Sequence, residues 1–221
     1  MKELLPERVY FVTGIDTDAG KTIATGYLSR TLLSEGVQVV TQKLIQTGND
    51  GISEDIQKHR EIEGRDLLPE DLDHTTNPLI YSYPCSPHMA IAIDGKEPEY
   101  GLAKASTKVL EERFEKVLLE GAGGLMVPLT LDKLTIDYIE EEKLPVILVT
   151  TAKLGSINHT ILSIEALQRR GIPLAMLVYN RGIATDDKIT EETEKYLRRY
   201  AGIYAAEAAF VVLPELENQK G

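Results

Sequence analysis

Short apolar, β-prone runs alternate with segments of helical periodicity along most of the chain. Helical spacing is visible at 22–35, which Gly36 ends, and at 99–116, 135–143 and 156–170. The apolar runs between them lie at 9–12, 37–42, 117–120, 145–151 and 174–179. Continuous apolar strands are typical of parallel sheets buried on both faces. The pattern therefore predicts an α/β fold: a three-layer, mostly parallel sheet with helices on both faces.

The remaining segments are shorter or more polar. Ser53 is expected to cap a polar helix that ends near residue 63, with Asp55 in its first turn. Residues 64–87 are rich in proline and are predicted to form a loop, and 86–93 a short helix that starts at Pro87. Thr185 or Asp186 is expected to cap a last helix that reaches about residue 200, and 210–213 is expected to form a final strand.

The segment from residue 9 to 22 has the layout of a phosphate-binding P-loop. An apolar strand leads into a glycine-containing loop, and Gly20-Lys21-Thr22 opens the first helix. Free backbone N–H groups there suit phosphate, Lys21 can reach the β- and γ-phosphates, and Thr22 can bind Mg²⁺. The loop is a variant, because Gly14 precedes the usual glycine position by one residue and Ile15 occupies that position. The alternative is a turn that merely contains this tripeptide.

Polar side chains follow three other apolar runs. Lys43 comes after the second strand, Glu120 ends the run 117–120 before a glycine-rich segment, and Asn180 follows the run 174–179. Ligands gather at the carboxyl edge of such sheets, and a carboxylate there suits Mg²⁺. Asn180 can offer a donor and an acceptor to adenine, and the guanine-specific Asn-Lys-x-Asp motif is absent, which favours ATP. The alternatives are a solvated Lys43 and an Asp55 that only complements its helix dipole.

Composition narrows the class of protein. A chain of 221 residues suits one domain, spanning 1–221, and the net charge of −11 argues against binding nucleic acid or an anionic membrane. Cys85 is the only cysteine, so an intramolecular disulfide is excluded and a reducing compartment is favoured. Without a signal-like start or a long apolar run, the chain is expected to be cytoplasmic. The four histidines have no metal-ligand spacing and are expected to be structural or exposed.

Several separated motifs together resemble dethiobiotin synthetase, an ATP-dependent ligase of biotin synthesis in the P-loop NTPase superfamily. The family also places its first loop glycine one position early. The matching segments are 14–22, Lys43 with Thr47-Gly48, Asp55, Ser86-Pro87-His88, 120–124 with Pro128-Leu129, 154–159 and Asn180. The resemblance implies that ATP and CO₂ or bicarbonate convert 7,8-diaminononanoate into a cyclic urea.

The resemblance also implies roles for individual residues. It assigns catalysis to Thr17, Lys21 and Lys43, and Mg²⁺ binding to Thr22, Asp55 and Glu120. Nucleotide contacts fall on Asp18, Ala19, Gly20, Lys21, Thr22, Ile23, Glu120, Gly123 and Asn180. Substrate contacts fall on Thr17, Lys43 and Thr47, and the carboxylate tail is received by Ser156, Ile157 and Asn158 of the other subunit. A homodimer with active sites at the interface is therefore expected.

Two other functions share the P-loop sheet. A dimeric ATPase switch of the partition or targeting type usually carries an additional lysine early in its loop, and no lysine precedes Lys21 in this loop. The synthetase part of an amidotransferase requires a glutaminase domain or partner, for which 221 residues leave no room. Both alternatives are less well supported by the sequence than the ring-closing ligase.

Overall fold

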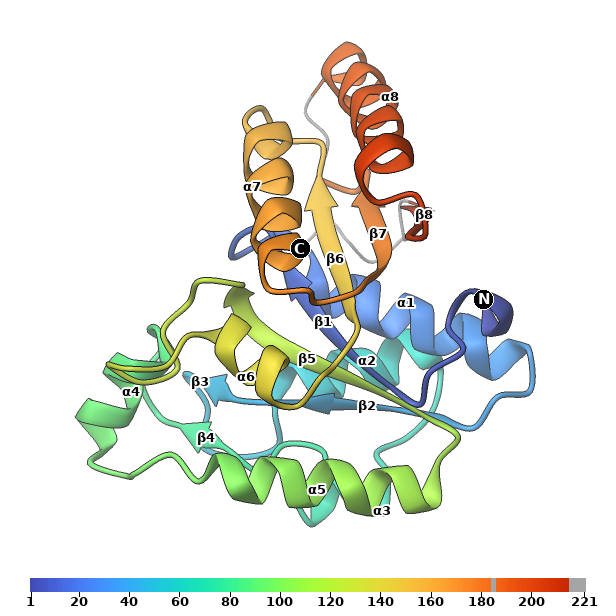
Figure 1. Cartoon of the computed structure of the whole chain (residues 1–221). Helices are drawn as coiled ribbons and strands as arrows, with labels where there is room; N and C mark the ends of the chain where they lie inside the picture. Colours follow the sequence, from blue (N-terminus) through green and yellow to red (C-terminus); the bar gives the residue numbers. More distant parts are fainter. Residues whose placement is uncertain (184–185, 215–221) are drawn as a thin grey trace.

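A six-stranded parallel sheet forms the centre of the computed structural model, which describes residues 1–183 and 186–214 (Figure 1). The strand order is β2-β5-β1-β6-β7-β8, and every neighbouring pair is parallel. The strands are β1 (Val9–Gly14), β2 (Val39–Lys43), β5 (Lys116–Gly124), β6 (Val146–Thr151), β7 (Leu174–Asn180) and β8 (Ala209–Leu213). The predicted parallel α/β sheet is confirmed.

Helices cover both faces of the sheet, which confirms the three layers. On one face α1 (Lys21–Ser34) packs against the strands through Ala24, Leu28 and Leu32, and α2 (Glu54–Glu63) packs on α1. The other face is covered by α5 (Tyr100–Arg113), α6 (Thr135–Glu141) and α7 (Ser156–Arg169), with α8 (Asp187–Tyr204) beside α7 (Figure 1). Because side chains alternate along a strand, Tyr10 and Phe11 fall in different core clusters.

Several predicted element boundaries differ from the structure; for example, the last helix continues to Tyr204 rather than ending at about residue 200. The fifth helix ends at Arg113 rather than near residue 116, because Phe114 is extended and the Lys116 N–H donates to the Gln38 carbonyl to begin β5. The strand itself continues through 121–124, which the sequence presented as a glycine-rich turn. A Cβ on Gly121 would lie 2.7 Å from the Phe11 ring, so this glycine permits close packing within the sheet.

The proline-rich segment contains short elements that the sequence did not predict. These are α3 (Pro69–Leu72) and β4 (Ile80–Tyr81), and β4 pairs in parallel with β3 (Gln46–Thr47) just beyond the central sheet. The remaining short elements are η1 (Lys2–Leu4) and α4 (Pro87–Asp94), and the second of these confirms the short helix starting at Pro87.

Helix caps agree with the sequence where they are described. The Ser53 hydroxyl accepts from the Ile56 N–H, and the Asp186 carboxylate accepts from the Ile189 N–H. Thr185, the alternative cap, lies outside the described residues. Within 1–183 and 186–214, no helix is long and apolar enough to cross a membrane.

Candidate active site

Three neighbouring strands bring the predicted catalytic residues together at one edge of the sheet. Lys43 is the last residue of β2 and lies directly opposite Glu120 of β5, which in turn lies opposite Val12 of β1. The P-loop follows β1, so β5 places Glu120 between the loop and Lys43. Residues far apart in the sequence are therefore adjacent because of the strand order.

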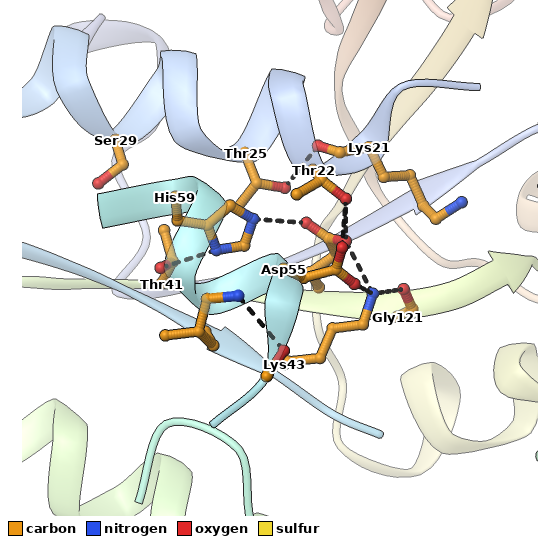
Figure 2. Close-up of polar contacts among 12 residues, drawn as sticks. Lys21, Thr22, Thr25, Ser29, Thr41, Lys43, Asp55, His59 and Gly121 are labelled. Carbon is orange, nitrogen blue, oxygen red and sulfur yellow. Dashed lines mark hydrogen bonds and ion pairs between the residues drawn. The ribbon is translucent and has the colours of Figure 1, made fainter. Parts of the chain in front are cut away.

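Lys43 is the centre of a buried ionic cluster (Figure 2). Its ammonium donates to Glu120 Oε1 at 2.8 Å and to the Gly121 carbonyl at 3.2 Å, and it also forms an ion pair with Asp55. The Thr22 hydroxyl contacts Asp55 Oδ1 at 2.8 Å and Glu120 Oε1 at 3.2 Å. Since Glu120 is 0% exposed and Lys43 is 5% exposed, their ion pair lies almost entirely out of solvent.

The electrostatics of this cluster keep both partners charged. Burial by itself raises the pKa of Glu120, but the charge of Lys43 and the hydrogen bond with His59 outweigh burial and hold the pKa well below its usual range. Burial lowers the pKa of Lys43, but the charges of Glu120 and Asp55 outweigh burial and raise it. Lys43 is thus a fixed positive charge rather than a general base.

Lys21 lies apart from this cluster, on the P-loop side (Figure 2). Its ammonium donates to the Asp16 carbonyl at 3.2 Å. An ammonium can donate three hydrogen bonds, and within the described residues Lys21 donates only this one. Its remaining hydrogens are available to phosphate oxygens. Burial, followed by the nearby charge of Lys43, lowers the pKa of Lys21.

A cavity of about 320 Å³ joins the P-loop to Lys43. Most of the predicted site residues line it, namely Thr17, Asp18, Gly20, Lys21, Thr22, Ile23, Lys43, Thr47, Asp55, Glu120 and Gly123. Ile45, Gln46 and Ala122 also line it and were not predicted. The sequence could have indicated these three residues only by their nearness, since each lies within two residues of a predicted site residue. The cavity therefore extends from the P-loop past Lys43 to Gln46 and Thr47.

Asn180 does not line this cavity and instead contacts the backbone of the P-loop from the end of β7. It is 1% exposed, its amide donates to the Ala19 carbonyl at 3.2 Å, and its carbonyl accepts from the Gly182 N–H at 2.9 Å. Ala19 is also outside the cavity lining and is buried. In this structure Asn180 thus links the end of β7 to the loop that precedes α1.

The three residues expected to receive a carboxylate begin α7. None of Ser156, Ile157 and Asn158 lines the cavity at Lys43. Ser156 is 3% exposed, and its hydroxyl has no hydrogen-bond partner within the described part of the chain. It lines a separate hollow of about 110 Å³ together with Thr17 and Asp18 of the P-loop.

The side-chain oxygens near Lys43 are of the kinds that bind Mg²⁺. Among residues 1–183 and 186–214, no group of three or more His, Cys, Asp or Glu side chains is placed to hold a metal ion. Thr22, Asp55 and Glu120 contribute one hydroxyl and two carboxylates. Mg²⁺ is commonly bound through one or two carboxylates together with substrate phosphates and water, so this donor set is compatible with it.

His59 belongs to the site although the sequence gave it no role beyond a structural or exposed one. Its ring contacts Glu120 at 3.0 Å and is fully buried. The signal that finds it is its spacing from Asp55: positions i and i+4 lie on the same face of a helix. The face of α2 that presents Asp55 to Lys43 therefore presents His59 to Glu120.

Sequence comparisons match nearly the whole chain. A family model described as an AAA domain matches residues 8–219. The ATP-dependent dethiobiotin synthetase BioD 2 of Pasteurella multocida (strain Pm70) is 46% identical over 206 residues, which is 93% of this chain and 97% of that protein. The ATP-dependent dethiobiotin synthetase BioD of Chlorobaculum tepidum is 43% identical over 203 residues, or 90% of this chain and 85% of that protein.

Among solved structures, a ParA family ATPase from Chlorobium tepidum TLS superimposes with a TM-score of 0.52 and 18% identity, covering 96% of this chain and 86% of that chain. Identity this low shows a shared fold and nothing about a shared activity. The dethiobiotin synthetases are similar in sequence along almost their full length. The chain therefore belongs to the dethiobiotin synthetase family.

Proposed function

We propose that this protein uses ATP to close the cyclic urea of dethiobiotin from 7,8-diaminononanoate and CO₂. The observation that carries this proposal is the buried ammonium of Lys43 in the cavity that starts at the P-loop. Lys43 is a second cation in this cavity besides Lys21, and it comes from the end of β2 rather than from the P-loop. A reaction that brings a carbamate and the γ-phosphate together needs such a cation between the two anions.

The proposed reaction has three steps. One amine attacks CO₂, forms a C–N bond and loses a proton, which leaves a carbamate. A carbamate oxygen then attacks the γ-phosphorus of ATP, the bond to the β-phosphate oxygen breaks, and ADP leaves. The second amine attacks the carbamoyl carbon, phosphate departs with the bonding electrons, and loss of a proton completes the ring.

The side chains of the cavity act mainly by position and charge. Lys21 binds the β- and γ-phosphates with the hydrogens that Asp16 does not use. Lys43 faces the carbamate and the transferring phosphoryl group, and its raised pKa keeps it positive while the two anions meet. Thr17 and Thr47 line the same cavity and hydrogen bond to the carbamate or the substrate amines.

Mg²⁺ is the proposed metal, held by Thr22, Asp55 and Glu120. When bound, it would neutralise the negative charge of the phosphates. The chain's own contribution is to converge three oxygen-bearing side chains from three elements and to keep Glu120 ionised. Asp18, Ala19, Gly20, Ile23 and Gly123 complete the nucleotide site, with Asn180 on the adenine side.

We also propose a homodimer in which Ser156, Ile157 and Asn158 of one subunit receive the carboxylate tail bound in the other. Two features support it: these residues do not line the cavity at Lys43 in their own subunit, and Asn158 is exposed. A single domain over 1–221 is supported by one central sheet, and a cytoplasmic location by the single cysteine.

The decisive experiment measures ADP release by the purified protein with ATP and Mg²⁺. Turnover is expected only when diaminononanoate and bicarbonate are both added, with dethiobiotin formed in equal amount by mass spectrometry. ATP hydrolysis at the same rate without the diamine would refute the proposal and favour an ATPase switch.

A further inference from the structure

His59 is a buried side chain that the proposed chemistry does not use directly. It lies on α2, one helical turn after Asp55, and is 0% exposed (Figure 2). Its Nε2 lies 3.0 Å from Glu120 Oε2, and its Nδ1 lies 3.0 Å from the Thr41 hydroxyl. Both ring nitrogens are therefore engaged, and one of them touches a carboxylate of the active site.

The hydrogen-bond partners of the His59 ring indicate which ring nitrogen carries the proton. Arg60 Nη1 donates to Thr41 Oγ1 at 2.8 Å, and a guanidinium can only donate. The hydroxyl has one hydrogen of its own, and His59 Nδ1 is the acceptor within reach. Glu120 settles the other ring nitrogen, because an ionised carboxylate can only accept: Nε2 carries a proton and donates it to Glu120 Oε2, while the Thr41 hydroxyl can donate to Nδ1.

This arrangement divides the two oxygens of Glu120 between two tasks. Oε2 accepts from His59, while Oε1 contacts Lys43 and the Thr22 hydroxyl. Rotation of the carboxylate away from the cavity would leave a buried donor and a buried acceptor unpaired, which is unfavourable. His59 therefore restricts Glu120 to the orientation in which Oε1 faces the cavity.

We infer that His59 is a positioning residue that holds Glu120 ready to bind the divalent cation of the nucleotide complex. This inference rests on the proposed function for the identity of the cation site. Its geometric basis is separate, because the hydrogen-bonded path from Arg60 through Thr41 and His59 to Glu120 is complete within the chain. Hydrogen bonds to metal-binding carboxylates commonly change metal affinity or activity by about 10–100-fold.

A matched pair of variants tests the donor. His59→Met and His59→Gln have similar length and volume, but only glutamine can donate to Glu120. With Mn²⁺ and ADP as the probe, followed by electron paramagnetic resonance, His59→Met is expected to weaken Mn²⁺ binding about 10–100-fold. His59→Gln is expected to recover most of that loss. Equal Mn²⁺ affinity in the folded His59→Met variant and the parent protein would overturn the inference.

Ser29→Ala is the control for a purely structural effect. Ser29 is buried on α1 and its hydroxyl bonds to Glu63 of α2, so this change weakens the contact between the same two helices without touching Glu120. It is expected to lower the unfolding midpoint and leave Mn²⁺ affinity unchanged. If Ser29→Ala and His59→Met weaken Mn²⁺ binding equally, His59 has no specific positioning role.

A measurement on the parent protein covers the case in which His59→Met does not fold. Nitrogen-15 spectra of the histidine rings distinguish the two neutral tautomers. The Nε2–H form is expected for His59, and the Nδ1–H form would overturn the inference. None of these measurements needs the diamine, so a parent protein that binds Mn²⁺ as expected but lacks diamine-dependent turnover refutes the proposed function alone.

Discussion

Substituting Gly20 by alanine tests how the P-loop is held in place. Gly20 has φ +85°, and a Cβ built there would lie 2.1 Å from Nδ2 of Asn180. Asn180 makes two hydrogen bonds there, since its amide donates to the Ala19 carbonyl and its carbonyl accepts from the Gly182 N–H. The methyl group of Gly20→Ala must therefore displace the side chain that links β7 to the loop.

The magnitude follows from two contributions. A non-glycine residue in the left-handed region costs about 1–2 kcal/mol. Breaking the two hydrogen bonds of Asn180 adds about 1 kcal/mol each. Gly20→Ala is therefore expected to lower the free energy of unfolding by about 3–4 kcal/mol. The matched control is Gly36→Ala, because Gly36 has φ +78° with nothing within 4 Å of its built Cβ, and it should cost only about 1–2 kcal/mol.

Urea unfolding followed by circular dichroism measures these differences. The double variant Gly20→Ala/Asn180→Ala gives the sharper result, because the hydrogen bonds that Asn180→Ala removes are already lost in Gly20→Ala. The two changes should therefore be less than additive by about 1–2 kcal/mol. Gly20→Ala should also weaken ADP binding, whereas Gly36→Ala should not. Equal costs for Gly20→Ala and Gly36→Ala, or simple additivity in the double variant, would refute the reasoning.

Two further predictions concern charged groups. Lys43→Gln should slow turnover at saturating diamine about 10²–10³-fold with little change in ADP affinity, whereas Lys21→Gln should reduce both; unchanged turnover in Lys43→Gln would contradict its role. Asp71→Asn should cost about 3 kcal/mol at pH 7 because it leaves buried Arg60 partly unpaired. Burial raises the pKa of Asp71, but Arg60 outweighs it and lowers the pKa, so this stability is present above about pH 4 and is lost as pH falls further. Urea unfolding should therefore show a smaller gap between Asp71→Asn and the parent at pH 3 than at pH 7, and a constant gap would contradict this.

Local patterns were enough to predict most of the fold. Apolar runs identified the strands that carry the P-loop, Lys43 and Glu120, because a strand buried on both faces is marked by its own residues. The pairing of β3 with β4 was missed, since two-residue strands are too short for any periodicity. The continuation of β5 through Gly121 was also missed, because the ring of Phe11 that packs there belongs to another strand.

The site was predictable where chemistry coincides with a strand end or loop, and not where it depends on the rotation of a helix. Asp55 is expected at the site only from the family resemblance, because its place in the first turn of α2 is equally explained by the helix dipole and the sequence does not say which face of that helix meets the sheet. His59 lies on that same face and reaches Glu120, whereas Arg60, the next residue, turns toward Asp71. Its role became evident only once α2 was placed against β2 and β5.

The strand order explains why this set of residues works as one site. β5 lies between β1 and β2, so the register that pairs Glu120 with Val12 on one side pairs it with Lys43 on the other. If β1 and β2 were neighbours, as their order in the sequence would allow, no strand would place a carboxylate between the P-loop and Lys43. The crossover that inserts β5 thus places the carboxylate of Glu120 between Lys21 of the P-loop and Lys43. Two positive charges are thereby held close to the same cavity, and Glu120 offsets the repulsion between them.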